Sequence, residues 1–391
     1  MRIVLVVPGG VDPPGSARTI PFVHHLVERL SADHRVTVLA TGHDPQPGEW
    51  RLFDADVINI PVGNHSKADI ARVVATATRR AAAGGRLDVV HGLWANLPGL
   101  AAGAIGRRHR VPAVVSVAGG EFANLPDIGY GGGLTTGSRL LASTAVRLAT
   151  TVTVATEWMR HHVAATGVRA GDVIPLGADT RIFRPATAGP ADPAALVHIG
   201  NLNRVKDQDL LLRSMAVLMA LQPDVHLTIA GADTLDGHHA RLAAELGVAD
   251  RITFAGHLPP PQLADVVRAA SWHVLTSRHD AGPVAVLEAA ACGVPTVGVL
   301  VGHVADFTGP AFNGPMAIAI EERTPAAVAH TLARSINGDL RPGIAERAER
   351  WAHTHDADAT AAAFEMLYRR LIASSSRRVA ASSGSVPRRS R

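Results

Sequence analysis

Cysteine and long apolar runs are almost absent from this 391-residue chain. Cys292 is the only cysteine, which excludes an intrachain disulfide and a metal site built on several thiolates. No stretch of 18 apolar residues occurs, so no transmembrane helix is predicted. The apolar run Ile3–Val7 is too short for the core of a signal peptide, which favours a first β-strand there. We therefore expect a cytoplasmic protein.

Aromatic residues and lysines are also scarce. Aromatic residues make up 4% of the chain, so alanine and valine must fill much of the core. Of the 38 basic residues only Lys67 and Lys206 are lysines. A compact ammonium suits a point contact with a phosphate, which favours a phosphate contact at Lys206, whereas Lys67 stands at the start of an exposed helix.

Positive charge is concentrated at the C-terminus. Residues 373–391 hold five arginines and no acid, so the formal net charge of +4 falls to 4 − 5 = −1 without them. A nearly neutral body argues against a protein that binds nucleic acid. The Arg/Ser-rich segment 373–391 is predicted to be disordered and solvated. Peripheral contact with anionic lipid at the inner face of the membrane is the alternative for it.

Several nucleotide and metal motifs are missing. There is no Walker G-x4-G-K-[ST] loop, and no G-x-G-x-x-G followed by an acid, which weakens a dehydrogenase interpretation. No zinc-ligand spacing occurs, so no metal site is predicted. Three pairs of adjacent histidines, at 24–25, 161–162 and 238–239, are interpreted as surface residues, because neighbours on a helix point about 100° apart.

Strand-like and helix-like segments alternate along the chain, which predicts an α/β fold with parallel sheets. The fold class expected is two doubly wound, Rossmann-like domains that face a cleft. The expected divisions are residues 1–183 for the first domain, 184–195 for a Pro/Ala-rich linker, 196–354 for the second domain, 355–372 for a helix that crosses back, and 373–391 for the tail.

The most informative segment of the chain runs from residue 272 to 301. A buried strand at Trp272–Leu275 is followed by the turn Ala281-Gly282-Pro283 and a helix at Val284–Ala291. Asp280 lies before the start of this helix, and Glu288 lies in its second turn. The free N–H groups and positive dipole end of the helix suit a diphosphate, with one carboxylate near a sugar and the other near a ribose.

This pattern resembles the E-x7-E motif of retaining glycosyltransferases of the GT-B fold, family four in particular. The block at 198–214 (HIGNLNRVKDQDLLLRS) is similar to that family's stretch after the first strand of the second domain. Lys206 falls on the family's phosphate-contacting lysine. Asn201 stands where the family usually has arginine, and Arg204 is the candidate to replace that cation.

Two further blocks extend the resemblance over about residues 2–371. IPLGADTRIFRP (174–185) is similar to the family's domain junction, with Gly177 and Asp179. LTIAGADTLDGHHARLAAELGVADRITFAGHLPPPQL (227–263) also matches, with Gly231 and Gly256 at strand ends. The resemblance implies a donor site formed by Gly200, Asn201, Arg204, Gly231, Ala281, Gly282, Pro283 and Val284.

The first domain departs more from the family. In VSVAGGEF, Ala118 replaces a histidine that reaches the transferring sugar in the family, and Glu121 is the candidate acid nearby. The loop at 126–133 is interpreted as an acceptor or lid loop. The expected acceptor or cleft residues are Gly9, Gly10, His91, Trp94, Gly119, Gly120 and Tyr130.

The resemblance implies a metal-independent, retaining hexosyltransferase with no bound cofactor, in which Asp280, Glu288, Lys206 and Glu121 act on a UDP- or GDP-sugar and a hydroxyl acceptor. The acceptor would be a glycan, a lipid-linked sugar or a small molecule. Two alternatives remain open: a protein that binds nucleotide sugar with little turnover, as a scaffold or partner subunit, and a sugar-nucleotide epimerase of similar architecture.

Overall fold

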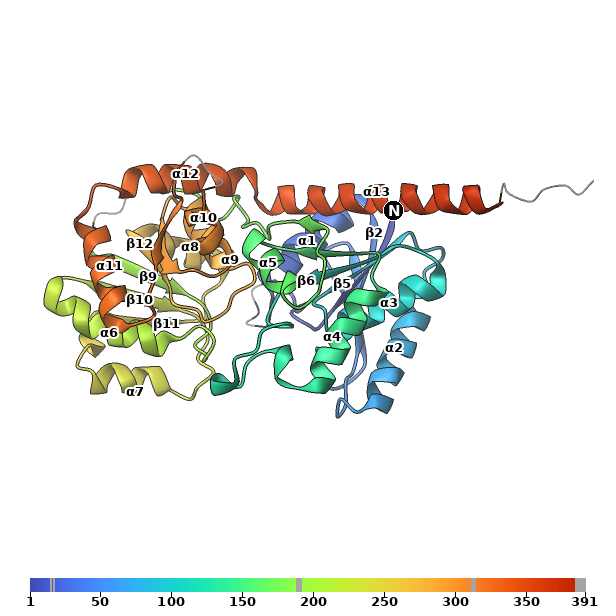
Figure 1. The fold of residues 1–391 in the computed structure, drawn as a ribbon, viewed down its shortest axis with the longest axis horizontal. Helices are drawn as coiled ribbons and strands as arrows, with labels where there is room; N and C mark the ends of the chain where they lie inside the picture. The colour runs from blue at the N-terminus through green and yellow to red at the C-terminus, as the bar shows by residue number, and fades with distance from the viewer. Residues whose placement is uncertain (15, 17, 188–191, 311–313, 384–391) are drawn as a thin grey trace, which may run out of the picture.

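The computed structural model describes residues 1–14, 16, 18–187, 192–310 and 314–383. Within these residues the chain forms two sheets that lie side by side (Figure 1). We call the unit around β1–β8 the first domain and the unit around β9–β14 the second domain. The predicted class, two doubly wound α/β domains, is confirmed. Part of the expected linker, residues 188–191, lies outside the described residues.

In the described part of the first domain, eight strands pair in the order β3-β4-β2-β1-β5-β6-β7-β8. All neighbours are parallel except β3, which forms an antiparallel hairpin with β4. The alternation pattern did not predict β3, because Glu49 and Arg51 interrupt its apolar residues at an exposed sheet edge. The strands are β1 (Arg2–Val7), β2 (Arg35–Thr41), β3 (Gly48–Leu52), β4 (Ala55–Ile60), β5 (Val89–Leu93), β6 (Ala113–Val117), β7 (Thr151–Val154) and β8 (Asp172–Val173).

Helices cover both faces of this sheet. They are α1 (Pro21–Asp33), α2 (Lys67–Ala82), α3 (Leu97–His109), α4 (Thr136–Leu148) and α5 (Glu157–Ala164), with two short turns, η1 (Pro126–Ile128) and η2 (Gly132–Leu134). The apolar strands β1, β5 and β6 are completely buried, as a strand covered on both sides requires.

The described second domain has a fully parallel sheet in the order β11-β10-β9-β12-β13-β14. The strand order reverses at β9, and ligands bind at such points, beyond the carboxyl ends of the strands. The strands are β9 (Ala195–Ile199), β10 (His226–Ala230), β11 (Ile252–Gly256), β12 (Trp272–Leu275), β13 (Thr296–Val299) and β14 (Ala317–Ile320). The helices are α6 (Gln208–Leu221), α7 (His238–Glu245), η3 (Ala249–Arg251), α8 (Pro260–Ala269), α9 (Val284–Ala291), α10 (Gly302–Thr308), α11 (Pro325–Asn337) and α12 (Arg341–Thr354).

The last helix, α13 (Ala357–Ser383), leaves the second domain and packs on the first (Figure 1). Phe364, Leu367 and Tyr368 are buried with the residues of β1 and α1 in one core. The Tyr368 hydroxyl lies 2.6 Å from Nδ1 of His91 in β5. Helix α13 is therefore attached to the first domain by buried apolar contacts and a buried hydrogen bond.

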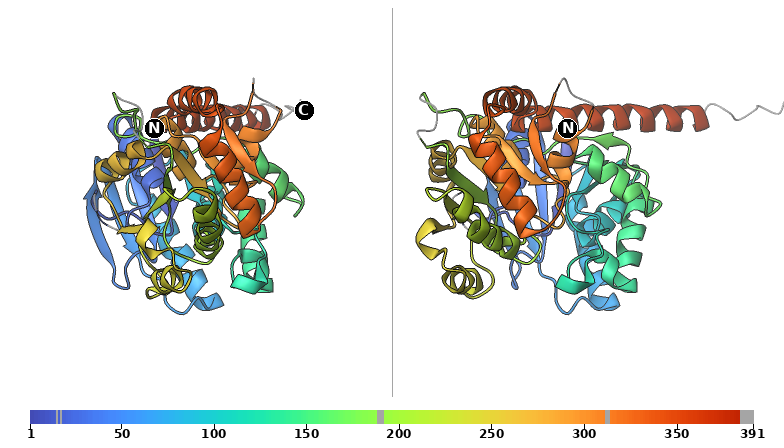
Figure 2. Two further views of the ribbon diagram at one scale, coloured as in Figure 1. Left: turned by 90° about the vertical axis from the view of Figure 1, so that its left-hand side faces the viewer. Right: turned by 60° about the vertical axis from the view of Figure 1, so that its left-hand side comes forward.

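The end of α13 corrects one prediction. Residues 373–383 are helical instead of disordered, and this part of the helix projects beyond the first domain (Figure 2). The prediction failed because the segment has few residues that break a helix, so it can continue the preceding turns. Residues 384–391 lie outside the described residues. None of the helices in the described part of the chain is both long and apolar enough to cross a membrane.

Truncating the chain after Ile372 should leave the melting temperature unchanged, because Ala373 and Ser374 beyond this point are already exposed. Thermal melts of the full chain and the truncated chain test this expectation. Truncation after Asp356 is the matched control. It removes Phe364 and Tyr368 from the core and should cost several kcal/mol, since deleting one buried aromatic side chain costs about 3–5 kcal/mol. A lower melting temperature after truncation at Ile372 would show that residues 373–391 pack on the first domain.

Candidate functional site

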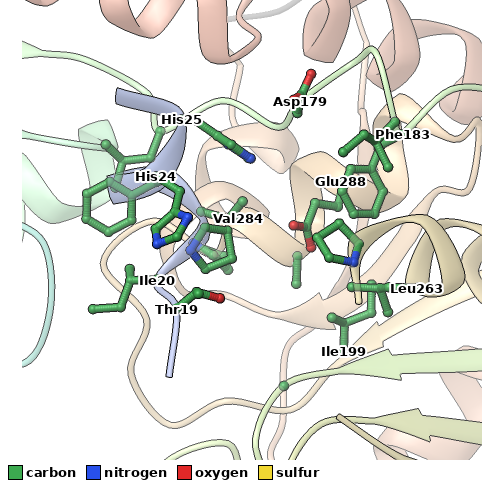
Figure 3. A pocket seen from close by; sticks show the side chains of 18 of the residues that line it. Thr19, Ile20, His24, His25, Asp179, Phe183, Ile199, Leu263, Val284 and Glu288 are labelled. Atoms are coloured by element: carbon green, nitrogen blue, oxygen red, sulfur yellow. The ribbon is translucent and has the colours of Figure 1, made fainter. Parts of the chain in front are cut away.

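A cavity of about 540 Å³ lies between the two domains. The first domain contributes α1 and the loop before it, and the second domain contributes the carboxyl ends of its strands and the start of α9. Figure 3 shows His24 and His25 on one side of the pocket and Glu288, Phe183 and Leu263 on the other. The cavity thus combines groups from both domains at the place where the strand order predicts a ligand.

The start of α9 forms one wall of this cavity, at Gly282, Pro283, Val284 and Ala285. No side chain caps the helix, so its first N–H groups remain available. The helix bounds agree with the sequence prediction, and Gly293 ends it in the left-handed region at φ +72°. This wall therefore offers backbone donors and a positive dipole end to an anion.

Glu288 faces the cavity from the second turn of the same helix. Its side chain is nearly buried, at 5% exposure, and this burial raises its pKa to about 7. Near neutral pH the carboxyl group of Glu288 is therefore partly protonated, and a bound ligand can shift it to either form. A hydroxyl donor, such as a ribose, stabilises the carboxylate form.

Lys206 and Asp280 form an ion pair on the cavity wall, in which Nζ donates to Oδ2. Both side chains are mostly covered, at 22% and 15% exposure. The loop that carries Lys206 is held against the end of β12, because the backbone N–H of Arg278 donates to the carbonyl of Val205 at 2.7 Å. The Thr276 hydroxyl also donates to the Lys206 carbonyl at 3.0 Å. The ammonium is thus fixed in place rather than carried on a free loop.

Two glycines, Gly200 after β9 and Gly231 after β10, let the ends of these two strands approach closely. A Cβ atom on Gly231, whose φ is +159°, would lie 2.1 Å from the carbonyl oxygen of Gly200. Both residues line the cavity. A larger residue at 231 would push the two strand ends apart and deform the floor of the site.

Neither Asn201 nor Arg204 places a cation in this cavity, where the family usually has an arginine at the position of Asn201. The Asn201 side chain lines the cavity, but its Oδ1 accepts from the N–H of Ala232 at 3.0 Å. Arg204 lines a different cavity and is not part of the main one, so its role as a replacement stays a prediction. Arg181 is a second cation in the lining of the main cavity, after Lys206. It pairs with Asp179 and Glu28.

Glu121 lies outside the cavity and serves as a brace for the backbone. Its Oε1 accepts from the N–H of Ala95 at 2.9 Å and of Ala118 at 3.2 Å, and its Oε2 accepts from Gly119 at 2.7 Å. Burial raises the pKa of this carboxyl group, and the three N–H donors oppose that shift. The predicted catalytic contribution of Glu121 is therefore corrected to a structural one, which positions Ala118 on the cavity wall.

His91 also lies outside the cavity. It is fully buried between the Tyr368 hydroxyl and the Ser116 hydroxyl, at 2.6 Å and 2.7 Å. The predicted acceptor role is thus corrected: this histidine joins the sheet to α13. The sequence could not show this, because its partner lies 277 residues away.

The other predicted first-domain residues do not line the cavity. They are Gly9, Gly10, Trp94, Gly119, Gly120 and Tyr130. A Cβ atom on Gly10 would lie 2.3 Å from Ile20, which itself lines the cavity, and Trp94 packs on Phe22 with ring centroids 5.3 Å apart. The Tyr130 ring lies 6.0 Å from that of His279, next to Asp280. Ala281 is likewise buried behind the wall. Gly10 and Trp94 thus pack behind residues of the lining.

The sequence patterns missed a polar group on the first-domain side of the cavity. It consists of His24, His25 and Glu28 of α1 with Asp179 and Arg181 of the domain junction. His24 is 7% exposed, and burial lowers the pKa of His25 to about 4, so the surface interpretation of this pair is wrong. The spacing of Glu28 one turn after His24 and His25 was the available signal, since i and i+4 share a helix face.

Comparison with known proteins agrees with this arrangement. The model described as "Glycosyl transferase 4-like domain" matches residues 19–177, and "Glycosyl transferases group 1" matches residues 179–353. A D-inositol 3-phosphate glycosyltransferase of Mycolicibacterium gilvum is 33% identical over 210 residues, 48% of this chain and 45% of that protein. Another, from Streptomyces coelicolor, is 28% identical over 273 residues, 62% and 59% of the two chains. The chain spans about half the length of the curated relatives it matches.

Solved structures share the whole fold. Sucrose-phosphate synthase from Thermosynechococcus elongatus superposes with a TM-score of 0.76 at 19% identity, over 95% of this chain and 99% of that chain. HepE of Anabaena in complex with UDP-glucose gives a TM-score of 0.69 at 18% identity, over 94% and 100%. These likenesses confirm the expected GT-B architecture.

Proposed function

We propose that this chain, which belongs to the GT4-like glycosyltransferases of the GT-B fold, moves a sugar from a nucleotide-diphosphate donor to an acceptor hydroxyl with retention of anomeric configuration. The observation that carries the proposal is that Glu288, the Lys206–Asp280 pair and the start of α9 line one cavity between the domains. An acid for a ribose, a cation for a diphosphate and a second acid for a sugar are the groups that such a donor requires.

The donor diphosphate would lie against the first N–H groups of α9 and the ammonium of Lys206. Glu288 would accept hydrogen bonds from ribose hydroxyls, and Asp280 from hydroxyls of the sugar. In the transfer the anomeric C–O bond to the diphosphate breaks and a bond to the acceptor oxygen forms. The departing nucleoside diphosphate takes the proton of the acceptor. Fixed positive groups stabilise the charge that develops on it, without a metal ion.

The acceptor would enter from the first-domain side of the cavity. Asp179, Glu28, His24 and His25 present hydrogen-bonding groups there, which suits a compound with several hydroxyls. Since the relatives named above are D-inositol 3-phosphate glycosyltransferases, a cyclitol phosphate is the first acceptor to test. UDP sugars are the first donors, because UDP and UDP-glucose occupy a neighbour of the same fold.

A ligand panel tests the donor first. Melting curves with UDP, GDP and ADP should show one base that raises the melting temperature, since a ligand at ~100 times its dissociation constant stabilises by roughly 2.7 kcal/mol. The matching nucleotide sugar is then incubated with D-inositol 3-phosphate and with other polyols in the presence of EDTA. Release of nucleoside diphosphate and a product with the donor's anomeric configuration, read by NMR, are expected. Saturable donor binding without any released diphosphate would favour a binding protein instead.

A further inference from the structure

A cluster of three metal-ligating side chains lies away from the proposed donor site. Asp209 belongs to the first turn of α6, and His238 and His239 open α7. Nε2 of His238 lies 2.9 Å from Oδ1 of Asp209, and Nε2 of His239 lies 3.2 Å from the same oxygen. Among the described residues this is a group whose ligand atoms all fall within 4.8 Å of one another. The two rings, expected to diverge on the surface, converge on one carboxylate.

The turn before α7 holds the two histidines in this arrangement. Asp233 accepts from the N–H of Leu235 at 2.9 Å and of Gly237 at 2.6 Å, and Gly237 begins the helix in the left-handed region at φ +75°. The ring centroids of His238 and His239 are 5.1 Å apart with planes at 74°. The turn thus fixes the start of α7, and the contacts with Asp209 bring the two rings together.

Two of the three separations are close to those around a tetrahedral ion. Zinc takes imidazole nitrogen and carboxylate oxygen at about 2.0–2.2 Å, so neighbouring ligand atoms in a tetrahedron are roughly 3.3 Å apart. The observed 2.9 Å and 3.2 Å require the ligands to separate by only a few tenths of an ångström.

The surroundings leave room for an open coordination position. The three side chains line a second cavity of about 570 Å³, together with Asp127 of the first domain. Two of the other carboxylates in the lining are already paired, Asp127 with Arg278 and Asp207 with Arg323. His239 is 2% exposed and its Nδ1 has no hydrogen-bond partner among the described atoms, whereas the side chains of His238 and Asp209 are 46% and 42% exposed.

We propose that Asp209, His238 and His239 form a zinc-binding site that joins α6 to α7, with the fourth position open to water in the second cavity. Imidazole with carboxylate favours zinc over magnesium or calcium, which prefer oxygen ligands. The site lies outside the machinery proposed for sugar transfer. Its role is to hold the two helices together, and it does not depend on the proposed reaction.

The test uses the full chain without a polyhistidine tag, freed of metal by a chelator that is then removed. Zinc should bind with a stoichiometry of one in calorimetry and raise the melting temperature by about 3 °C at ~100 times its dissociation constant. Magnesium should leave it unchanged. Cobalt should give the visible absorption of a tetrahedral nitrogen/oxygen site.

His238→Ala and Asp209→Asn should abolish the zinc shift and the cobalt spectrum while keeping the metal-free melting temperature, because both side chains are half exposed. His226→Ala is the matched control, since His226 pairs with Asp192 at 3.5 Å on a similarly exposed surface but has no third ligand in the cluster. It should keep zinc binding. Lack of saturable zinc binding by the wild type, or an unchanged zinc shift in His238→Ala, would overturn the proposal.

Discussion

Replacing Lys206 by alanine is expected to lower kcat/KM for sugar transfer by roughly 10²–10³, the range for losing one preorganised group that stabilises developing charge. Lys206 lines the cavity next to the start of α9 and pairs with Asp280. Asn201 is uncharged, and Arg181, the other cation of the cavity named above, pairs with both Asp179 and Glu28. We therefore expect the departing diphosphate to depend on the ammonium of Lys206. Steady-state kinetics with the donor found in the ligand panel measures the effect.

Arg204→Ala is the matched control, because Arg204 lies only two residues earlier but lines the other cavity. It should stay near wild-type activity. Lys206→Arg should recover only part of the loss, since a planar guanidinium on a different stem misplaces the charge and does not reproduce a compact ammonium. If Arg204→Ala proves the more damaging change, the cation of this loop has been assigned to the wrong residue.

Replacing Glu288 by glutamine should make the protein more stable at pH 8 and weaken its binding of the donor. Burial raises the pKa of Glu288 from 4.5 to about 7. The neutral acid is thus favoured in the folded state, so its contribution to stability is complete below pH 4.5 and is lost as the pH rises through about 7. A shift of this size corresponds to roughly 3 kcal/mol. Glutamine, which never ionises, avoids this loss.

Urea unfolding at pH 4.5 and pH 8 measures the stability, and calorimetry measures donor affinity. The variant should exceed the wild type at pH 8 but match it at pH 4.5, while its donor dissociation constant rises by about 10–100-fold for the loss of a charged acceptor. Glu245→Gln, on the exposed side of α7, should change neither property. Unaltered donor affinity in the Glu288 variant would remove this residue from the ribose contact.

The second domain was the part most accurately predicted from sequence. The strand at Trp272–Leu275, the turn at Pro283 and the helix at Val284–Ala291 all lie where the pattern placed them. The reason is that the signals there are local: an apolar run, a Gly-Pro turn and a glycine stop follow one another within about one supersecondary unit. The Lys206–Asp280 contact joins two such loops at neighbouring strand ends, which parallel topology brings together.

The residues that sequence reasoning misplaced depend on distant partners. The interpretation of His91 required knowledge of Tyr368, which α13 brings back from the other end of the chain. The interpretation of Glu121 required knowledge of three backbone N–H groups that follow the ends of β5 and β6. The pair His24 and His25 faces the cleft only because the second domain lies opposite α1. The relations of His91 and Glu121 leave no period or motif in the sequence.

The junction between the domains fixes where the cleft can pivot. The chain passes between the domains twice, near Gly177 and near Asp356, and the two passages touch. The N–H of Ala357 donates to the carbonyl of Ala178 at 2.9 Å, and the N–H of Gly177 donates to the Thr360 hydroxyl at 2.9 Å. A Cβ atom on Gly177 would lie 2.2 Å from the backbone of Asp356. Two connections at one point permit rotation about that point and oppose sliding. Opening of the cleft then has to break contacts that bridge the domains elsewhere, such as the ion pair between Arg278 and Asp127 and the hydrogen bonds that Asp306 of α10 accepts from the start of α5.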